Sequence, residues 1–155
     1  MDRIDRKILA ELERDARQSF VTLGEAVGLS KTPCWTRVQE LERTAAILGY
    51  HAELSPAALG LEVTAYVELV IEPTRRIDFE AAIAQSAVVI ECLTMAGEAD
   101  YLLKIFCRDV AQLDNVLRNE LTLLPGVQRT KTTICLKSIK TGGSLAAAAA
   151  ALAGQ

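Results

Sequence analysis

Residues 22–41 read TLGEAVGLSKTPCWTRVQEL, and this stretch decides the fold of the N-terminal part of the chain. Thr22 and Glu25 have capping-box spacing for the start of a first helix, and Gly28 can adopt the left-handed backbone that ends it. Ser30 is a suitable N-cap for a second helix. Apolar residues at helical spacing on both sides of the turn give the two helices a shared core: Leu23, Val27, Leu29, Cys34, Val38 and Leu41. The stretch therefore predicts a helix-turn-helix.

The neighbouring segments extend this motif into a small headpiece. An earlier helix is predicted from Asp2 to Arg14, because four apolar residues fall on one of its faces: Ile4, Ile8, Leu9 and Leu12. Residues 46–54, AILGYHAEL, are apolar and β-capable around a central glycine, so we expect a short strand or wing there. Residues 55–60 follow as a linker or a single helical turn.

From residue 61 the hydrophobic period changes to that of strands. We expect strands at 61–71, 88–95, 101–107 and 127–137, with helices at 78–86 and from the Asp109 cap to Pro125 and Gly126. The order βαββαβ is that of a split ferredoxin-like (ACT-like) sandwich, with one antiparallel sheet and both helices on one side. The predicted fold class is therefore α+β, a winged helix-turn-helix followed by this unit.

These patterns divide the chain into four parts. We expect a helix-turn-helix domain with its wing at 1–54, a linker at 55–61, the sheet domain at 62–140, and a flexible or helical Ala-rich tail at 141–155. The strands 88–95 and 101–107 are apolar on both faces, although the domain's own helices cover only one face. A large exposed apolar face would favour aggregation, and a second copy of the same sheet is the simplest way to cover it. We therefore expect a homodimer.

Composition and charge limit the class of protein. Half of the 155 residues are hydrophobic, but no apolar run has the length of about 18 residues that a membrane span needs, and the N-terminus MDRIDRK is charged. We therefore expect a cytoplasmic protein without a membrane partner. The net charge is −3: residues 1–50 hold eight basic and eight acidic residues, and residues 51–155 hold nine and twelve. This balance neither supports nor excludes nucleic acid as a partner.

Enzymatic and metal chemistry find little support in the sequence. The four cysteines, Cys34, Cys92, Cys107 and Cys135, have no CxxC spacing and fall in apolar elements, so we interpret them as buried free thiols. His51 is the only histidine, and no GxSxG, GxGxxG or P-loop motif accompanies it. We expect no catalytic residues, no metal site and no cofactor.

Five segments, in order over residues 2 to about 140, resemble the Lrp/AsnC (leucine-responsive regulatory protein and asparagine-synthase regulator) family of prokaryotic transcription factors. They are DRIDRKILAELERDAR, GLSKTPCWTRVQELE, ILGYHAELSP, AGEADYLLKI and LPGVQRTKTTICL. The chain departs from the family at Ala45, where glycine is usual. A left-handed backbone at Ala45 would cost about 1 kcal/mol.

The resemblance gives the second helix of the motif a role in DNA binding. Because an α-helix turns about 100° per residue, the apolar positions lie opposite Thr32, Thr36, Gln39 and Arg43, which we expect to face the major groove. Ser30 and Lys31, at the N-terminus of this helix, are better placed for phosphate. Arg37 either contacts phosphate or pairs with Glu40 or Glu42.

Residues 95–101, MAGEADY, form a hairpin turn by composition. A free amino acid needs a carboxylate for its ammonium group and N–H donors for its own carboxylate, and Asp100 or Glu98 and an open loop at Gly97 could supply them. The resemblance implies that effectors bind at this Gly-x-x-Asp-Tyr segment between dimers, so the expected effector-binding residues are Met95, Gly97, Glu98, Asp100 and Tyr101. Homodimers would then assemble to tetramers or octamers.

The function that these features predict is that of a sequence-specific, double-stranded-DNA-binding transcriptional regulator that responds to an amino acid or a related small effector. The alternative is an amino-acid-binding regulatory module that acts through protein–protein contacts, with the headpiece used for assembly.

Overall fold

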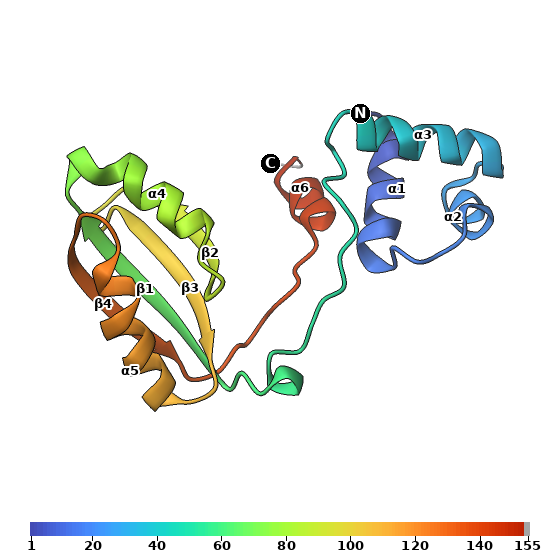
Figure 1. Cartoon of the computed structure of the whole chain (residues 1–155). Helices are drawn as coiled ribbons and strands as arrows, with labels where there is room; N and C mark the ends of the chain where they lie inside the picture. Colours follow the sequence, from blue (N-terminus) through green and yellow to red (C-terminus); the bar gives the residue numbers. More distant parts are fainter. Residues whose placement is uncertain (154–155) are drawn as a thin grey trace. The chain divides into compact units, whose positions relative to one another are not determined.

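The computed structural model describes residues 1–153, which divide into two compact units (Figure 1). Within the described residues, the N-terminal unit contains residues 1–52 and 140–153. The C-terminal unit contains residues 53–139. Each unit has its own hydrophobic core.

The headpiece contains the three predicted helices, α1 (Arg3–Arg14), α2 (Phe20–Val27) and α3 (Lys31–Arg43). Asp2 caps α1 by accepting hydrogen bonds from the amides of Ile4 and Asp5. Six side chains that are at most 6% exposed form the core between the helices: Ile8, Leu23, Val27, Cys34, Val38 and Leu41. The helix-turn-helix and its core are thus as the sequence predicts.

The start of α2 differs from the prediction. The N-cap is Ser19, whose hydroxyl accepts a hydrogen bond from the Thr22 amide at 3.1 Å, and Thr22 lies inside the helix. The predicted capping box of Thr22 and Glu25 is therefore wrong. The physical reason is that Phe20 packs against the headpiece core, so the helix begins early enough to include it.

The turn between α2 and α3 requires two glycines. Gly28 ends α2 with a left-handed backbone, φ 78°, as predicted. Gly24 lies where α2 meets the turn: a Cβ atom there would be 2.7 Å from the carbonyl oxygen of Leu29. The Leu29 amide also donates to the Gly24 carbonyl oxygen at 2.8 Å, so this close approach fixes the turn.

The chain leaves α3 through a left-handed residue, Ala45, with φ 56°. The amides of Ala45 and Ala46 donate back to the carbonyl oxygens of Glu42 and Leu41, which is the Schellman arrangement. The strand predicted within residues 46–54 is wrong, because the four strands found in residues 1–153 all pair within the other unit. Instead Tyr50 holds this irregular segment to α3 by donating a hydrogen bond to Glu42 at 2.9 Å.

The C-terminal unit has the predicted βαββαβ order. Its elements are β1 (Val63–Ile71), α4 (Arg76–Ala84), β2 (Val89–Thr94), β3 (Tyr101–Cys107), α5 (Val110–Asn119) and β4 (Val127–Cys135). Three short 3-10 turns join them: η1 (Ala57–Leu59), η2 (Pro73–Arg75) and η3 (Leu121–Leu123). The strands pair antiparallel in the order β2-β3-β1-β4, which confirms the predicted α+β sheet.

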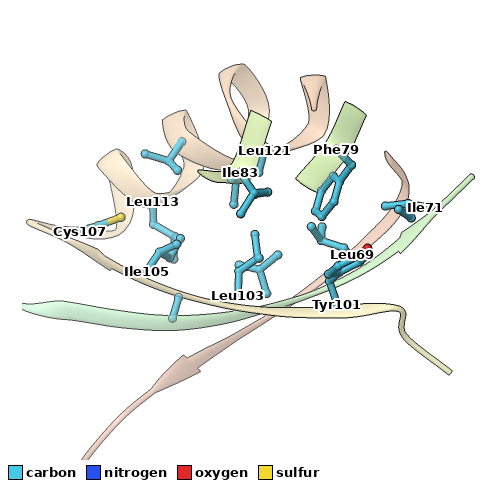
Figure 2. Packing of buried hydrophobic residues seen from close by; sticks show 13 residues of the cluster. Leu69, Ile71, Phe79, Ile83, Tyr101, Leu103, Ile105, Cys107, Leu113 and Leu121 are labelled. Carbon is cyan, nitrogen blue, oxygen red and sulfur yellow. The ribbon is translucent and has the colours of Figure 1, made fainter. Parts of the chain in front are cut away.

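One face of this sheet is covered by helices and the other is open. Figure 2 shows the side chains of the covered face pointing from the strands toward the helices. On β3, Tyr101, Leu103, Ile105 and Cys107 are at most 2% exposed, and α4 and α5 contribute Phe79 and Leu113 to the same cluster. The strand register places the alternate residues on the open face, including Tyr66, Val70, Leu93, Leu102 and Phe106.

The C-terminal tail forms helix α6 (Leu145–Ala153), which lies beside α1 (Figure 1). Glu13 of α1 caps it from outside: its carboxylate accepts hydrogen bonds from the Ser144 hydroxyl, the Leu145 amide at 2.6 Å and the Ala146 amide at 3.2 Å. The Ser144 and Leu145 hydrogen bonds hold the pKa of Glu13 below its ordinary value. Of the two expected states of the tail, the helical one is found over Leu145–Ala153, and the last two residues lie outside the described part.

The left-handed backbone of Ala45 gives a test of stability. We expect Ala45→Gly to raise the free energy of unfolding by about 0.5–1 kcal/mol, because glycine removes the Cβ strain at positive φ. Urea denaturation of the full chain, followed by circular dichroism, measures this change. The control is Ala10→Gly at an exposed position of α1, which should lower stability by a similar amount. Equal losses for both variants would contradict the expectation.

Candidate functional site

The outward face of α3 brings together the four residues predicted from its helical period. Thr32, Thr36, Gln39 and Arg43 are exposed, and they lie opposite the buried core positions of the same helix. At the N-terminus of α3, Ser30 and Lys31 are exposed as well. Ser30 is the N-cap residue, but its side chain makes no capping hydrogen bond, so the hydroxyl stays available to another acceptor or donor.

Arg37 turns away from this face toward the start of α1. One nitrogen of its guanidinium lies 2.6 Å from Asp2 and 2.7 Å from Asp5. The expected pairing of Arg37 with Glu40 or Glu42 is therefore wrong: its protein partners are on another helix. The Asp5 amide and the Arg37 side chain lower the pKa of Asp2. Arg37 thus joins α3 to the capped end of α1.

Two groove-facing candidates have carboxylate partners within α3. The Nε and Nη2 atoms of Arg43 donate to the two carboxylate oxygens of Glu40 at 2.7 and 2.6 Å. The Gln39 side-chain amide donates to Glu42 at 2.8 Å. The predicted site did not include Glu40. Its position three residues before Arg43 was a sign of this ion pair, because side chains at that spacing are neighbours on a helix.

Asp100 anchors the loop between β2 and β3. Its carboxylate accepts a hydrogen bond from the Ile71 amide at 3.0 Å and lies 3.4 Å from the guanidinium of Arg76. Its own amide donates to the Leu69 carbonyl oxygen at 2.9 Å. Asp100 therefore fixes the loop to the end of β1, with both carboxylate oxygens already engaged.

The predicted loop residues differ sharply in their exposure to solvent. Met95, Gly97 and Glu98 are exposed in the loop, whereas Tyr101 is 2% exposed on the helix-covered face. The Tyr101 hydroxyl donates to Glu80 of α4. Burial, with the hydrogen bond to Glu80, raises the pKa of Tyr101 to about 12, so the phenol stays protonated as a donor.

A small pocket lies where this loop meets the open face of the sheet. Its volume is about 110 Å³, and its lining residues are Glu68, Val70, Glu98, Ala99, Arg129 and Lys131. Lys131 Nζ lies 3.4 Å from both carboxylate oxygens of Glu68, its cross-strand partner. The pocket therefore presents two carboxylates and two cations together. Of the predicted loop residues it includes Glu98 alone, and the charged residues of β1 and β4 were missed.

Residues 1–153 contain no group of three or more histidine, cysteine or carboxylate side chains arranged to hold a metal ion. All four cysteines are free thiols, with Cys34 and Cys107 buried and Cys92 and Cys135 partly buried. Within the same range, no helix is both long and apolar enough to cross a membrane.

Comparisons with known proteins agree with both units. The model of the AsnC-type helix-turn-helix domain matches residues 1–42, and that of the Lrp/AsnC ligand binding domain matches residues 64–145. The leucine-responsive regulatory protein of Salmonella typhimurium is 39% identical over 148 residues, covering 94% of this chain and 90% of the relative. The proline dehydrogenase transcriptional activator of Rhizobium radiobacter is 38% identical over 146 residues, with 92% and 94% covered.

Solved structures give the same result. A transcriptional regulator of Neisseria meningitidis in complex with L-Met superposes with a TM-score of 0.88 at 34% identity, covering 91% of this chain and 93% of the other. An AsnC family transcriptional regulator of Agrobacterium tumefaciens gives a TM-score of 0.86 at 30% identity, with 94% and 96% covered. With a matching headpiece, sheet domain and set of relatives, the chain belongs to the Lrp/AsnC family of transcriptional regulators.

Proposed function

We propose that this protein is a homodimeric, sequence-specific DNA-binding regulator that responds to a free amino acid or a closely related zwitterion. The observation that carries the effector class is the pocket on the open sheet face, in which two carboxylates and two cations lie together. An amino acid carries an ammonium and a carboxylate on one carbon, so it needs both signs of charge in one small site.

The headpiece supplies the DNA contacts. Thr32, Thr36, Gln39 and Arg43 offer hydroxyl, amide and guanidinium groups that match the donors and acceptors of base edges in the major groove. Ser30 and Lys31 lie at the N-terminus of α3, where the helix dipole favours a phosphate. Arg37 serves this face indirectly, because its ion pairs with Asp2 and Asp5 set the position of α3 on α1.

The pocket supplies the effector contacts. Glu68 and Glu98 suit the ammonium group, and Arg129 and Lys131 suit the carboxylate. A Cβ atom at Gly97 would meet only open space, and Met95 is an exposed apolar residue at the start of the loop. Asp100 and Tyr101 support the site without contacting the effector. Asp100 holds the loop to β1, and Tyr101 holds β3 to α4.

The size of the pocket indicates that a neighbouring copy completes it. Its volume of about 110 Å³ is well below the roughly 300–1,000 Å³ of sites that enclose a small ligand. The open face around it carries Tyr66, 37% exposed, and Leu93, 46% exposed, together with Leu102 and Phe106. A second sheet packed on this face would bury that apolar surface and close the site, and larger assemblies of such dimers would be sensitive to the effector.

DNA binding is tested by selection from a random double-stranded library with the full-length chain. We expect the enriched sequences to contain two inverted half-sites about one helical turn apart, or a multiple of it, because a dimer presents two α3 helices. Failure to enrich any sequence would contradict the proposal and favour a regulator that acts through protein contacts.

The roles of Arg37 and Lys31 are separable by salt dependence. We expect Arg37→Ala to lower the melting temperature while the slope of log affinity against log salt stays unchanged, since Arg37 pairs within the protein. Lys31→Ala should leave the melting temperature unchanged and reduce that slope by about two, because each protomer of the dimer loses one phosphate contact. A reduced slope for Arg37→Ala would show that Arg37 contacts phosphate after all.

The dimer is tested with charge substitutions at two exposed apolar residues. Leu93→Glu, on the open sheet face, should weaken dimerisation at least about tenfold, because it places a charge in an apolar interface. Ile77→Glu, on the opposite side of the domain at 83% exposure, is the matched control and should leave it intact. Sedimentation equilibrium at several concentrations measures both, and a monomeric wild-type chain at micromolar concentration would refute the dimer.

The effector class is tested by thermal shift against the twenty amino acids. We expect one or a few of them to raise the melting temperature, because a ligand at a hundred times its Kd stabilises by about 2.7 kcal/mol. Arg129→Gln should weaken that ligand more than about tenfold by removing a charge-assisted hydrogen bond. Arg118→Gln, which removes an exposed arginine paired with Asp114 on α5, is the control. Equal ligand responses in the two variants would place the effector elsewhere.

A further inference from the structure

The outward face of α3 also carries a carboxylate, that of Glu40. Glu40 follows Thr36 by four residues and precedes Arg43 by three, so all three share one face of the helix. The Glu40 side chain is 57% exposed and the Arg43 side chain 71% exposed. A carboxylate on a face that contacts DNA repels the phosphates and lowers the affinity. Glu40 therefore calls for a role that offsets this loss.

The ion pair between the two residues restricts Arg43 in a particular way. Glu40 engages Nε and Nη2, at 2.7 and 2.6 Å, which is one edge of the guanidinium. The edge formed by Nη1 and Nη2 keeps two parallel N–H donors. These donors match N7 and O6 of a guanine in the major groove. The carboxylate therefore orients Arg43 without using the edge that reads a base.

The charge balance of the headpiece gives Glu40 a second effect. Residues 1–50 hold as many acidic as basic side chains, and Arg37 is already paired with Asp2 and Asp5. Without Glu40, Arg43 would be a flexible cation able to pair with any phosphate. With Glu40 beside it, an approach to phosphate brings the carboxylate toward the same anion. The penalty applies wherever Arg43 approaches a phosphate, so it falls mainly on non-specific complexes, which depend on phosphate contacts.

We propose that Glu40 is a positioning residue for DNA readout, which holds Arg43 toward a guanine and opposes its use as a phosphate contact. Glu40 thereby sets the ratio of specific to non-specific affinity. This inference rests on the proposed role of Arg43 at a base edge.

The test compares two neutralising substitutions in the headpiece. Glu40→Gln and Glu25→Gln change the net charge equally, but Glu25 is exposed on α2 and forms no ion pair within residues 1–153. The probes are a duplex enriched by the full-length wild-type chain from a random library and a scrambled duplex of the same composition. Titrations at several salt concentrations, with melting temperatures as a check of folding, give both affinities and their salt slopes.

We expect Glu40→Gln to lower the ratio of the two affinities about tenfold, chiefly through tighter binding of the scrambled duplex, with a salt slope there that is steeper by about two, one for each protomer. Glu25→Gln should change both affinities alike and keep the ratio. In an Arg43→Ala background, Glu40→Gln should leave the ratio unchanged, since it acts through Arg43.

Three results would overturn the inference. One is a ratio that falls no further for Glu40→Gln than for Glu25→Gln, and another is an equal fall in the Arg43→Ala background. Both leave DNA binding itself standing, because a sequence has been enriched. A wild-type chain that enriches no sequence would overturn the inference together with the proposed function.

Discussion

One-sided burial of the C-terminal sheet is the constraint on which the rest of this structure depends. Along β3, every second side chain is at most 2% exposed beneath α4 and α5, and the residues between them face outward. The covered face is therefore a packed core, and the proposed effector and dimer contacts use the open face and its edge loop. The charged pocket lies at that edge, on the face that has no helix.

The sequence was sufficient to predict elements whose cause is local. Hydrophobic patterns with periods of 2 and 3.6 residues located the strands and helices. Gly28 marked the end of α2, because glycine adopts a left-handed backbone more easily than other residues. The errors arose where tertiary contacts decide. Phe20 joins the headpiece core and moves the start of α2 to Ser19, and residues 46–54 have β-capable side chains but no neighbouring strand edge.

The candidate sites divide in the same way. The outward face of α3 could be predicted because it follows from the helical repeat alone. By contrast, Lys131 and Glu68 meet through strand pairing across 63 residues, and Arg37 and Asp2 meet across 35. Sequence spacing contains no sign of either pair. The loop residues were identified by resemblance, yet the side of the sheet that each occupies depends on strand register, which sends Tyr101 into the core.

The tail helix has a consequence for the mechanics of the molecule. The chain passes from the headpiece into the sheet domain near residue 53 and returns near residue 140, where Glu13 captures the start of α6. The headpiece is thus attached at two points, one covalent and one a reversible hydrogen-bonded clasp. While the clasp is closed, the headpiece is joined to the sheet domain through two stretches of chain instead of one. The second stretch begins at the end of β4, the strand that carries Arg129 and Lys131. The strand that lines the charged pocket and the helix held by Glu13 are therefore neighbours along the chain, separated by one short segment.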